Sequence, residues 1–257
     1  MSDTTLKQRM RNKDLVTGIG VDMKHTLQDL ERILDKNPCD FLCIDSQHSA
    51  FNEDRLESFC KSAQSLQIPV IFRIKHTRHT YLIGNYLDLG PTGVLVPEVR
   101  AEASVDEAIQ SFYYPQFGKR SSGGSARWGI EAHPDRLAYA EWWNDTGILQ
   151  VQLESIDAVV NCGKLGKDGV DAFTFGPNDL LYDIESYTDP PFKTVEQCIE
   201  HVVSEMSGTD VAVGIGIQHP GDREKYLDMG LTVLQTPLVV RCFKALGRAA
   251  PPWKESA

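Results

Sequence analysis

The sequence predicts a (β/α)₈ barrel, one domain over residues 1–257, from three observations. Eight short apolar runs recur along the chain, segments with helical periodicity fill the gaps, and the length is 257 residues. Runs rich in Val, Ile, Leu and Phe are typical of parallel strands buried on both faces. Barrels of this kind often form one domain of about 250 residues. The alternative is an open doubly wound sheet, but "VGIGIQ" (213–218) lacks the third glycine of its phosphate-binding turn and comes late in the chain.

The predicted strands cover residues 15–21, 41–45, 70–74, 93–99, 148–155, 172–176, 211–216 and 232–237. The predicted helices cover residues 26–37, 52–66, 78–90, 102–111, 134–145, 194–206 and 220–230. Asn52 is a suitable N-cap, and acidic residues follow it in the first turn. Pro220 near the start and Gly230 past the end favour the last of these helices.

The longest interval between predicted strands, residues 100–147, is expected to form a loop or lid at the rim of the barrel. Its centre, "YYPQFGKRSSGGSARWG" (113–129), is rich in Gly and Ser and carries Lys119, Arg120 and Arg127. A flexible surface excursion and a loop that contacts an anionic substrate both fit this composition. Residues 238–257 are expected to form a C-terminal helix and tail.

Composition excludes several classes of protein. The net charge of −10 disfavours nucleic acid as the main partner, because phosphate binding needs a basic surface. No apolar run approaches the roughly 20 residues of a membrane span, so no membrane partner is expected. The six cysteines form no CxxC pair, and several lie in apolar runs as free thiols do. Without a secretory segment near the N-terminus, we expect a reducing, cytoplasmic setting.

Polar residues collect where the predicted strands end, and catalytic groups of barrels lie at the carboxyl ends of strands. They are Asp45, Gln47, His48, Arg73, Pro97, Glu98, Gln152, Glu154, Asn178, Asp179, Gln218, His219, Gln235 and Thr236. Glu154 and Asp179 are 25 residues apart, one βα unit, so they fall on neighbouring strand ends. Two carboxylates that close repel unless a proton or a cation lies between them, and Mg²⁺ or Mn²⁺ suits such a pair. Helix caps are the structural alternative.

Two further residues carry possible chemistry. His48 follows a buried strand within three residues, and imidazole is suited to moving a proton near neutral pH. Arg73 ends a very apolar strand and is either a clamp on a substrate carboxylate or enolate, or a salt-bridge partner. No HxxxH or CxxC spacing indicates a dedicated zinc site, and "HTRH" (76–79) favours a solvated turn.

Several segments, taken in order, resemble the metal-dependent (class II) pyruvate aldolases of the HpcH/HpaI family over about residues 6–245. They include "CDFLCIDSQHSAFN", "IPVIFRI", "YLDLGPTGVLVPEVRAEASVDEAI", "VQLES" and "DAFTFGPNDLL". The family includes 2-keto-3-deoxy-sugar-acid and 4-hydroxy-2-oxoheptanedioate aldolases. The resemblance implies a barrel of the phosphoenolpyruvate/pyruvate type that assembles as trimers or hexamers, with the C-terminal helix exchanged between subunits.

The resemblance also implies roles for individual residues. Glu154 and Asp179 would hold Mg²⁺ or Mn²⁺ (Co²⁺ or Zn²⁺ are possible), which a 2-oxo acid chelates. Arg73 would steady the enolate oxygen, and His48, backed by Asp88, would move the proton. Asp45 and Gln47 would hold water on the metal. The remaining substrate-binding residues would be Gln152, Gly176, Pro177, Asn178 and Arg120.

Two departures from the family pattern bear on specificity. Gln47 stands where a glutamate is common, and Gly20 stands in the position of an aromatic residue, which predicts a roomier pocket. The predicted activity is that of an aldehyde-lyase that cleaves or forms 4-hydroxy-2-oxo acids from a pyruvate-type enolate and an aldehyde. The alternatives are an oxaloacetate decarboxylase, an acyl-CoA lyase of the citrate lyase β-subunit type, and a non-catalytic binding protein.

Overall fold

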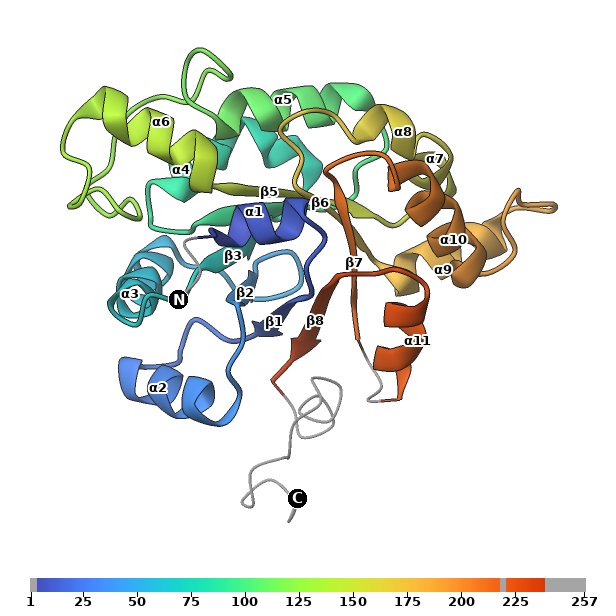
Figure 1. Cartoon of the computed structure of the whole chain (residues 1–257), viewed down its shortest axis with the longest axis horizontal. Helices are drawn as coiled ribbons and strands as arrows, with labels where there is room; N and C mark the ends of the chain where they lie inside the picture. The colour runs from blue at the N-terminus through green and yellow to red at the C-terminus, as the bar shows by residue number, and fades with distance from the viewer. Residues whose placement is uncertain (1–3, 218–220, 239–257) are drawn as a thin grey trace.

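The computed structural model describes residues 4–217 and 221–238, which form a closed parallel barrel (Figure 1). Each strand pairs with the next, and β8 closes the sheet against β1. The strands are β1 (Val16–Gly20), β2 (Phe41–Asp45), β3 (Val70–Arg73), β4 (Gly93–Val96), β5 (Ile148–Leu153), β6 (Ala172–Phe175), β7 (Ala212–Gly216) and β8 (Val233–Pro237). Each lies within one of the eight predicted runs, so the predicted (β/α)₈ fold is confirmed.

Helices surround the barrel and are arranged as follows: α1 (Leu6–Arg11), α2 (Leu27–Lys36), α3 (Glu53–Ser65), the 3₁₀ helix η1 (Thr77–Leu82), α4 (Ile83–Leu87), α5 (Glu102–Phe112), α6 (Arg136–Thr146), α7 (Ile156–Val160), α8 (Cys162–Leu165), α9 (Pro177–Ser186), α10 (Val195–Met206) and α11 (Asp222–Asp228). Side-chain caps fix several starts, including Thr26 before α2 and Asn52 before α3. The predicted helix 78–90 is in fact η1 followed by the short α4.

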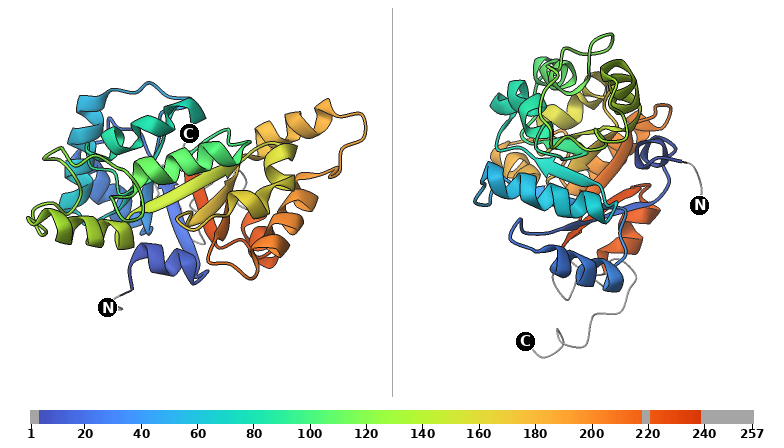
Figure 2. Two further views of the ribbon diagram at one scale, coloured as in Figure 1. Left: turned by 90° about the horizontal axis from the view of Figure 1, so that it is seen from above. Right: turned by 90° about the vertical axis from the view of Figure 1, so that its left-hand side faces the viewer.

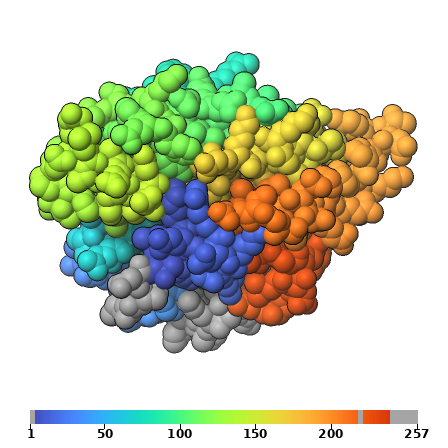
Figure 3. Space-filling model, turned by 45° about the horizontal axis from the view of Figure 1, so that its top comes forward, coloured from blue at the N-terminus to red at the C-terminus, as the bar shows by residue number. Residues whose placement is uncertain are grey.

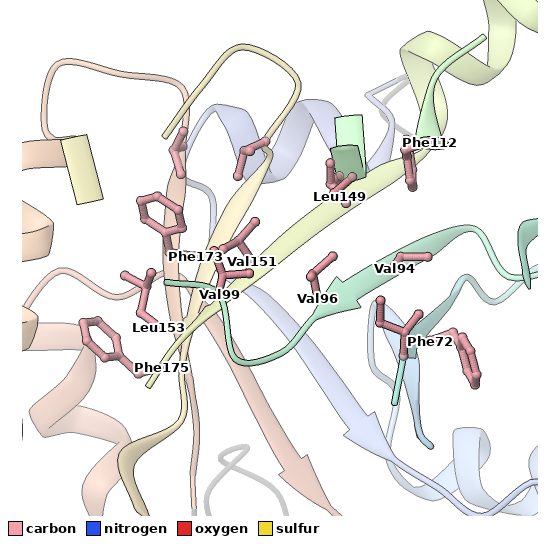
Figure 4. Close-up of a cluster of buried hydrophobic side chains, with 14 of the residues drawn as sticks. Phe72, Val94, Val96, Val99, Phe112, Leu149, Val151, Leu153, Phe173 and Phe175 are labelled. Carbon is pink, nitrogen blue, oxygen red and sulfur yellow. The ribbon is translucent and has the colours of Figure 1, made fainter. Parts of the chain in front are cut away.

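Two apolar layers hold the barrel. The larger lies between the strands and the helices, and Figure 4 shows part of it, with Val94, Val96, Leu149, Val151 and Phe173 on the outer face of the sheet. The smaller fills the amino end of the barrel interior. Its members are Met10, Val16, Phe41, Ile71, Leu95, Ile148, Ala172, Ala212 and Val233. Because the amino end is packed solid, open space is left at the carboxyl ends of the strands.

Helix α1 closes the amino end of the barrel (Figure 2, left). Lys7, only 4% exposed, donates to the Tyr113 hydroxyl, the Gly147 carbonyl and the Asp171 carboxylate. Arg11 bonds the other oxygen of Asp171 at 2.8 Å. Burial lowers the pKa of Lys7 against the attraction of Asp171. The helix also packs on α6, and Figure 3 shows the N-terminal segment next to the region of α6. This cluster therefore serves stability at the end opposite the expected site.

The segment 100–147 does not form the expected rim lid over this chain. Helix α5 has already carried the chain from the carboxyl end of β4 to the amino end of the barrel when residue 113 is reached. There the Arg120 side chain lies over the rings of Tyr114 and Trp143, and Trp143 Nε1 donates to the Phe112 carbonyl. The segment therefore covers the amino end of the barrel rather than the rim.

Other expectations have mixed outcomes. The expected C-terminal helix and its exchange between subunits fall on residues 239–257, outside the described residues. Four cysteines of the described residues are free thiols, as predicted: Cys43, Cys60, Cys162 and Cys198. Within residues 4–217 and 221–238, no helix combines the length and apolar character required to cross a bilayer.

Candidate active site

A cavity of about 740 Å³ opens at the carboxyl ends of the strands. Eight of the predicted site residues line it: Asp45, His48, Arg73, Gln152, Gly176, Pro177, Asn178 and Asp179. They come from strands β2, β3, β5 and β6 and the turns that follow these strands. The parallel arrangement therefore gathers in one place side chains that are more than a hundred residues apart in the sequence.

Glu154 and Asp179 come together, as their spacing predicts. Glu154 follows β5 directly, and Asp179 lies in the first turn of α9, where Pro177 begins the helix and a carboxylate is favoured by the helix dipole. Both residues line a second cavity of about 550 Å³ that adjoins the first through Asp179. Asp179 is exposed to this space, whereas Glu154 is only 6% exposed.

The two oxygens of Glu154 have different environments. Oε1 accepts the backbone N–H of Glu98 at 2.5 Å, whereas Oε2 is buried and has no hydrogen-bond partner among the described residues. Burial raises the pKa of Glu154 to about 7; the Glu98 N–H opposes this shift, and the negative charge of Asp179 adds to it. A buried, unbonded carboxylate oxygen beside a second carboxylate lacks a positive partner, and a proton or a cation would supply it.

Gly176, between β6 and α9, gives Glu154 its space. A Cβ at this position would lie 2.6 Å from Gln152 Nε2 and 2.6 Å from Glu154 Oε2. Any larger residue would therefore displace one of these side chains. The space beside Gly176 and the carboxylate oxygens of Glu154 and Asp179 fit a hard divalent cation. Within residues 4–217 and 221–238, no three His, Cys, Asp or Glu side chains are placed to hold a metal, so water or substrate oxygens would complete the coordination.

Arg73 is both a salt-bridge partner and a cavity residue. Its Nε donates to Asp45 Oδ1 at 2.8 Å and its Nη2 to Asp45 Oδ2 at 2.5 Å, a bidentate pair. Its Nη1 lies 3.4 Å from Gln152 Oε1. Partial burial raises the pKa of Asp45, but the hydrogen bonds from Arg73 outweigh it, so this pKa lies below its ordinary value. The two alternatives for Arg73 are therefore compatible, because Asp45 fixes the guanidinium at the cavity.

His48 is at the cavity without the partner expected for it. Its backbone N–H contacts Asp45 Oδ1 at 3.4 Å, and its side chain is exposed. Asp88 instead caps the carboxyl end of α4, where Arg120 Nη2 donates to it at 2.9 Å. Burial raises the pKa of Asp88, and the bond from Arg120 offsets only part of this effect.

Neither Asp88 nor Arg120 lines the cavity of this chain. The physical reason is the direction of α4. This helix returns the chain from the carboxyl end of β3 toward the amino end of β4, so a residue at its end leaves the rim.

Sequence reasoning missed the part played by Glu98. Its carboxylate accepts from Gln47 Nε2 at 2.9 Å and lies 2.8 Å from His76 Nε2. Its φ of 54° is in the left-handed region, which is uncommon for a residue with a side chain. An acidic residue after β4 was visible in the sequence, but its backbone conformation and partners were not.

Lys24 and His25, after β1, also line the cavity. The predicted strand-end residues Gln218 and His219 lie outside the described residues.

Fold and cavity together define a (β/α)₈-barrel protein with a carboxylate-rich site at the carboxyl ends of its strands. The chain belongs to the HpcH/HpaI aldolase/citrate lyase family, whose model matches residues 23–238. A 2-keto-3-deoxy-L-rhamnonate aldolase of Klebsiella pneumoniae is 29% identical over 83% of this chain and 80% of its own. A 4-hydroxy-2-oxo-heptane-1,7-dioate aldolase of Escherichia coli is 28% identical over 80% of each chain.

Solved structures also share this fold. An HpcH/HpaI aldolase from Desulfitobacterium hafniense superimposes with a TM-score of 0.78 at 23% sequence identity. The match covers 91% of this chain and 90% of that one.

Proposed function

We propose that this protein is a metal-dependent aldolase, an aldehyde-lyase that cleaves or forms 4-hydroxy-2-oxo acids. The observation that carries the proposal is the buried, unbonded Oε2 of Glu154 beside Asp179, at a cavity that also holds a fixed guanidinium. The curated relatives support the reaction class, because they are named as aldolases of 2-oxo acids.

Glu154 and Asp179 would hold a divalent cation, with Mg²⁺ or Mn²⁺ preferred for an oxygen donor set. Such an ion supplies positive charge that lowers the energy of a pyruvate-type enolate. Asp45 would orient water beside it, since Arg73 fixes the Asp45 carboxylate at the cavity.

The 2-oxo acid would bind between Arg73, Gln152 and the first turn of α9. The Gly176 N–H already donates to the Leu153 carbonyl at 3.0 Å and Pro177 has no N–H, so Asn178 and Asp179 would present the backbone donors for the substrate carboxylate. Arg73 Nη1, which Asp45 leaves free, would donate to the developing enolate oxygen.

His48 would hold and move the proton, because it is an imidazole at the mouth of the cavity. Within this chain Asp88 and Arg120 are bonded to each other, so neither is assigned to the site of the same subunit. As in the sequence-based expectation, we propose that the protein assembles as a trimer or hexamer.

The acceptor aldehyde would enter from the side of β1. Gly20 lines the cavity, and among the described residues a Cβ built there would meet only Pro237 and Thr236 atoms, at 3.6 and 3.7 Å. This space suits an aldehyde with a chain of several atoms rather than a small one. An oxaloacetate decarboxylase would use the same carboxylates and arginine without an acceptor and is the second candidate.

The test is carbon–carbon bond formation by protein stripped with EDTA and reloaded with Mg²⁺ or Mn²⁺. Pyruvate is mixed with a panel of aldehydes of increasing length, and 4-hydroxy-2-oxo acids are measured by mass spectrometry, with oxaloacetate decarboxylation followed in parallel. We expect adducts only after reloading and at least a hundredfold loss in Glu154→Gln. Adducts from the stripped protein would contradict the proposal, and decarboxylation without adducts would favour the second candidate.

A further inference from the structure

Glu98 is in an unusual backbone conformation immediately after β4. Its φ of 54° lies in the left-handed region, where the Cβ is crowded by the backbone, so other contacts must hold it there. Four such contacts surround it. The Thr77 hydroxyl donates to its carbonyl at 3.2 Å, its N–H donates to Glu154, and its two carboxylate oxygens face Gln47 and His76.

The partners of the Glu98 carboxylate are both hydrogen-bond donors. His76 Nδ1 accepts the Arg78 backbone N–H at 2.9 Å, so its Nε2 carries a hydrogen and donates to Glu98. Gln47 can face a carboxylate only through its amide nitrogen, and Nε2 lies 2.9 Å from Glu98 Oε1. A glutamate at residue 47 would instead place two carboxylates in contact. The carboxylate of Glu98 therefore explains why residue 47 is a glutamine, which can donate a hydrogen bond to it.

These contacts join the cationic and anionic parts of the site. The Gln47 N–H donates to Asp45 Oδ1 at 2.8 Å, and Asp45 holds Arg73. On the other side, the Glu98 N–H holds only one oxygen of Glu154 and leaves Oε2 without a partner. A continuous set of hydrogen bonds therefore runs from Arg73 through Asp45, Gln47 and Glu98 to Glu154.

We propose that Glu98 is a positioning residue: its side chain, fixed by Gln47 and His76, locks the backbone so that its N–H turns Glu154 Oε2 toward the cation. This inference rests on the proposed metal-dependent function. It assigns Gln47 to the bond with Glu98, in place of contact with water on the metal. Glu98 lines the second cavity with Glu154 and Asp179, but among the described residues these three carboxylates are not placed to hold a metal together, so Glu98 acts through Glu154.

The test measures Mn²⁺ affinity of the stripped protein from the free Mn²⁺ signal in electron paramagnetic resonance, without any turnover. Glu98→Gly keeps the N–H and permits the backbone but loses the anchors, and we expect Kd to rise at least tenfold. Gln47→Glu should weaken binding similarly through repulsion. The exchanged pair Gln47→Glu with Glu98→Gln should return Kd to within about threefold of wild type, because the amide–carboxylate contact is restored in reverse.

Controls separate the possible failures. Glu102→Gln changes an acidic residue that pairs with Lys167 away from the cavity and should leave Kd unchanged. Melting curves establish that each variant is folded. If the single variants bind Mn²⁺ as wild type does, or the exchanged pair binds no better than Gln47→Glu, the inference is wrong. If Glu154→Gln binds as wild type does, or wild type binds no Mn²⁺, the proposed metal site fails and this inference fails with it.

Discussion

The buried position of the Glu154 carboxylate disfavours its charged form. Its carboxylate is buried beside Asp179, and only one of its oxygens is bonded. In the metal-free protein its pKa is raised to about 7 by burial, against an ordinary value of 4.5. The fold therefore prefers the protonated form. The protonated Glu154 side chain contributes fully to the free energy of unfolding below pH 4.5. This contribution is lost as the pH rises through about 7, where the folded protein must lose the proton.

Glu154→Gln should stabilise the metal-free protein above neutral pH, because the amide carries no charge to bury. From the raised pKa of Glu154, we expect the variant to gain about 1–3 kcal/mol in the free energy of unfolding at pH 8, and almost none at pH 4.5. Urea denaturation in EDTA at the two pH values measures this difference, with Glu102→Gln as the exposed control. An equal effect at both pH values would show that the charge of Glu154 is not responsible.

At the scale of elements, the turn between β6 and α9 sets the geometry of the site. The sequence predicted the strand, and the polar residues after it indicated the rim of a barrel. It could not show that Gly176 is needed for space rather than for its backbone angle. That depends on Gln152 and Glu154, which approach from the neighbouring strand.

Gly176→Ala tests this steric requirement. The added methyl group would collide with Gln152 and Glu154, so Mn²⁺ affinity should fall at least tenfold, equivalent to about 1.4 kcal/mol. Gly208→Ala is the matched control, because a Cβ there meets no atom of the described residues within 4 Å. Isothermal titration calorimetry on the stripped proteins measures both. Unchanged affinity in Gly176→Ala would show that the turn adjusts without moving Glu154.

The position of each site residue relative to its strand or helix decided whether it could be predicted from the sequence. Asp45 and Arg73 end their strands, Glu154 follows β5, and Asp179 lies in the first turn of the helix after β6, so the fold class was enough to place them at one end. Asp88 follows a helix, and its expected pairing with His48 came from resemblance; the direction of α4 takes it elsewhere in this chain. Short helices such as α7 and α8 were missed because a few residues carry too little periodicity.

At the scale of the whole molecule, the packed contacts that stabilise the fold and the polar residues of the candidate site lie at opposite ends of the barrel. The amino end is filled by Met10 and closed by the Lys7–Asp171 cluster, whereas the carboxyl end is open and carries the polar residues. The eight apolar runs sufficed to predict the barrel. They could not predict that the segment after α5 covers the amino end, because its aromatic contacts with α6 are not periodic.

Lys7→Ala should destabilise the protein without altering the site. Removing the ammonium leaves the buried Asp171 with Arg11 and the Leu149 N–H, and we expect a loss of about 3 kcal/mol. Urea denaturation gives this value, with Lys164→Ala, an exposed lysine, as the control expected to change stability by less than about 0.5 kcal/mol. Mn²⁺ affinity at 25 °C should be unchanged. A large change in affinity would contradict the separation of the two ends.

The central claim is that Glu154 and Asp179 hold a cation that allows proton removal from a 2-oxo acid. The most direct measurement is the exchange of pyruvate methyl protons for deuterium in D₂O, followed by ¹H NMR without any aldehyde. We predict rapid exchange with Mg²⁺-loaded protein, none with EDTA-treated protein, and at least a hundredfold slower exchange in Glu154→Gln and Asp179→Asn. Exchange that persists in the chelated protein, or in either variant at the wild-type rate, would contradict the claim.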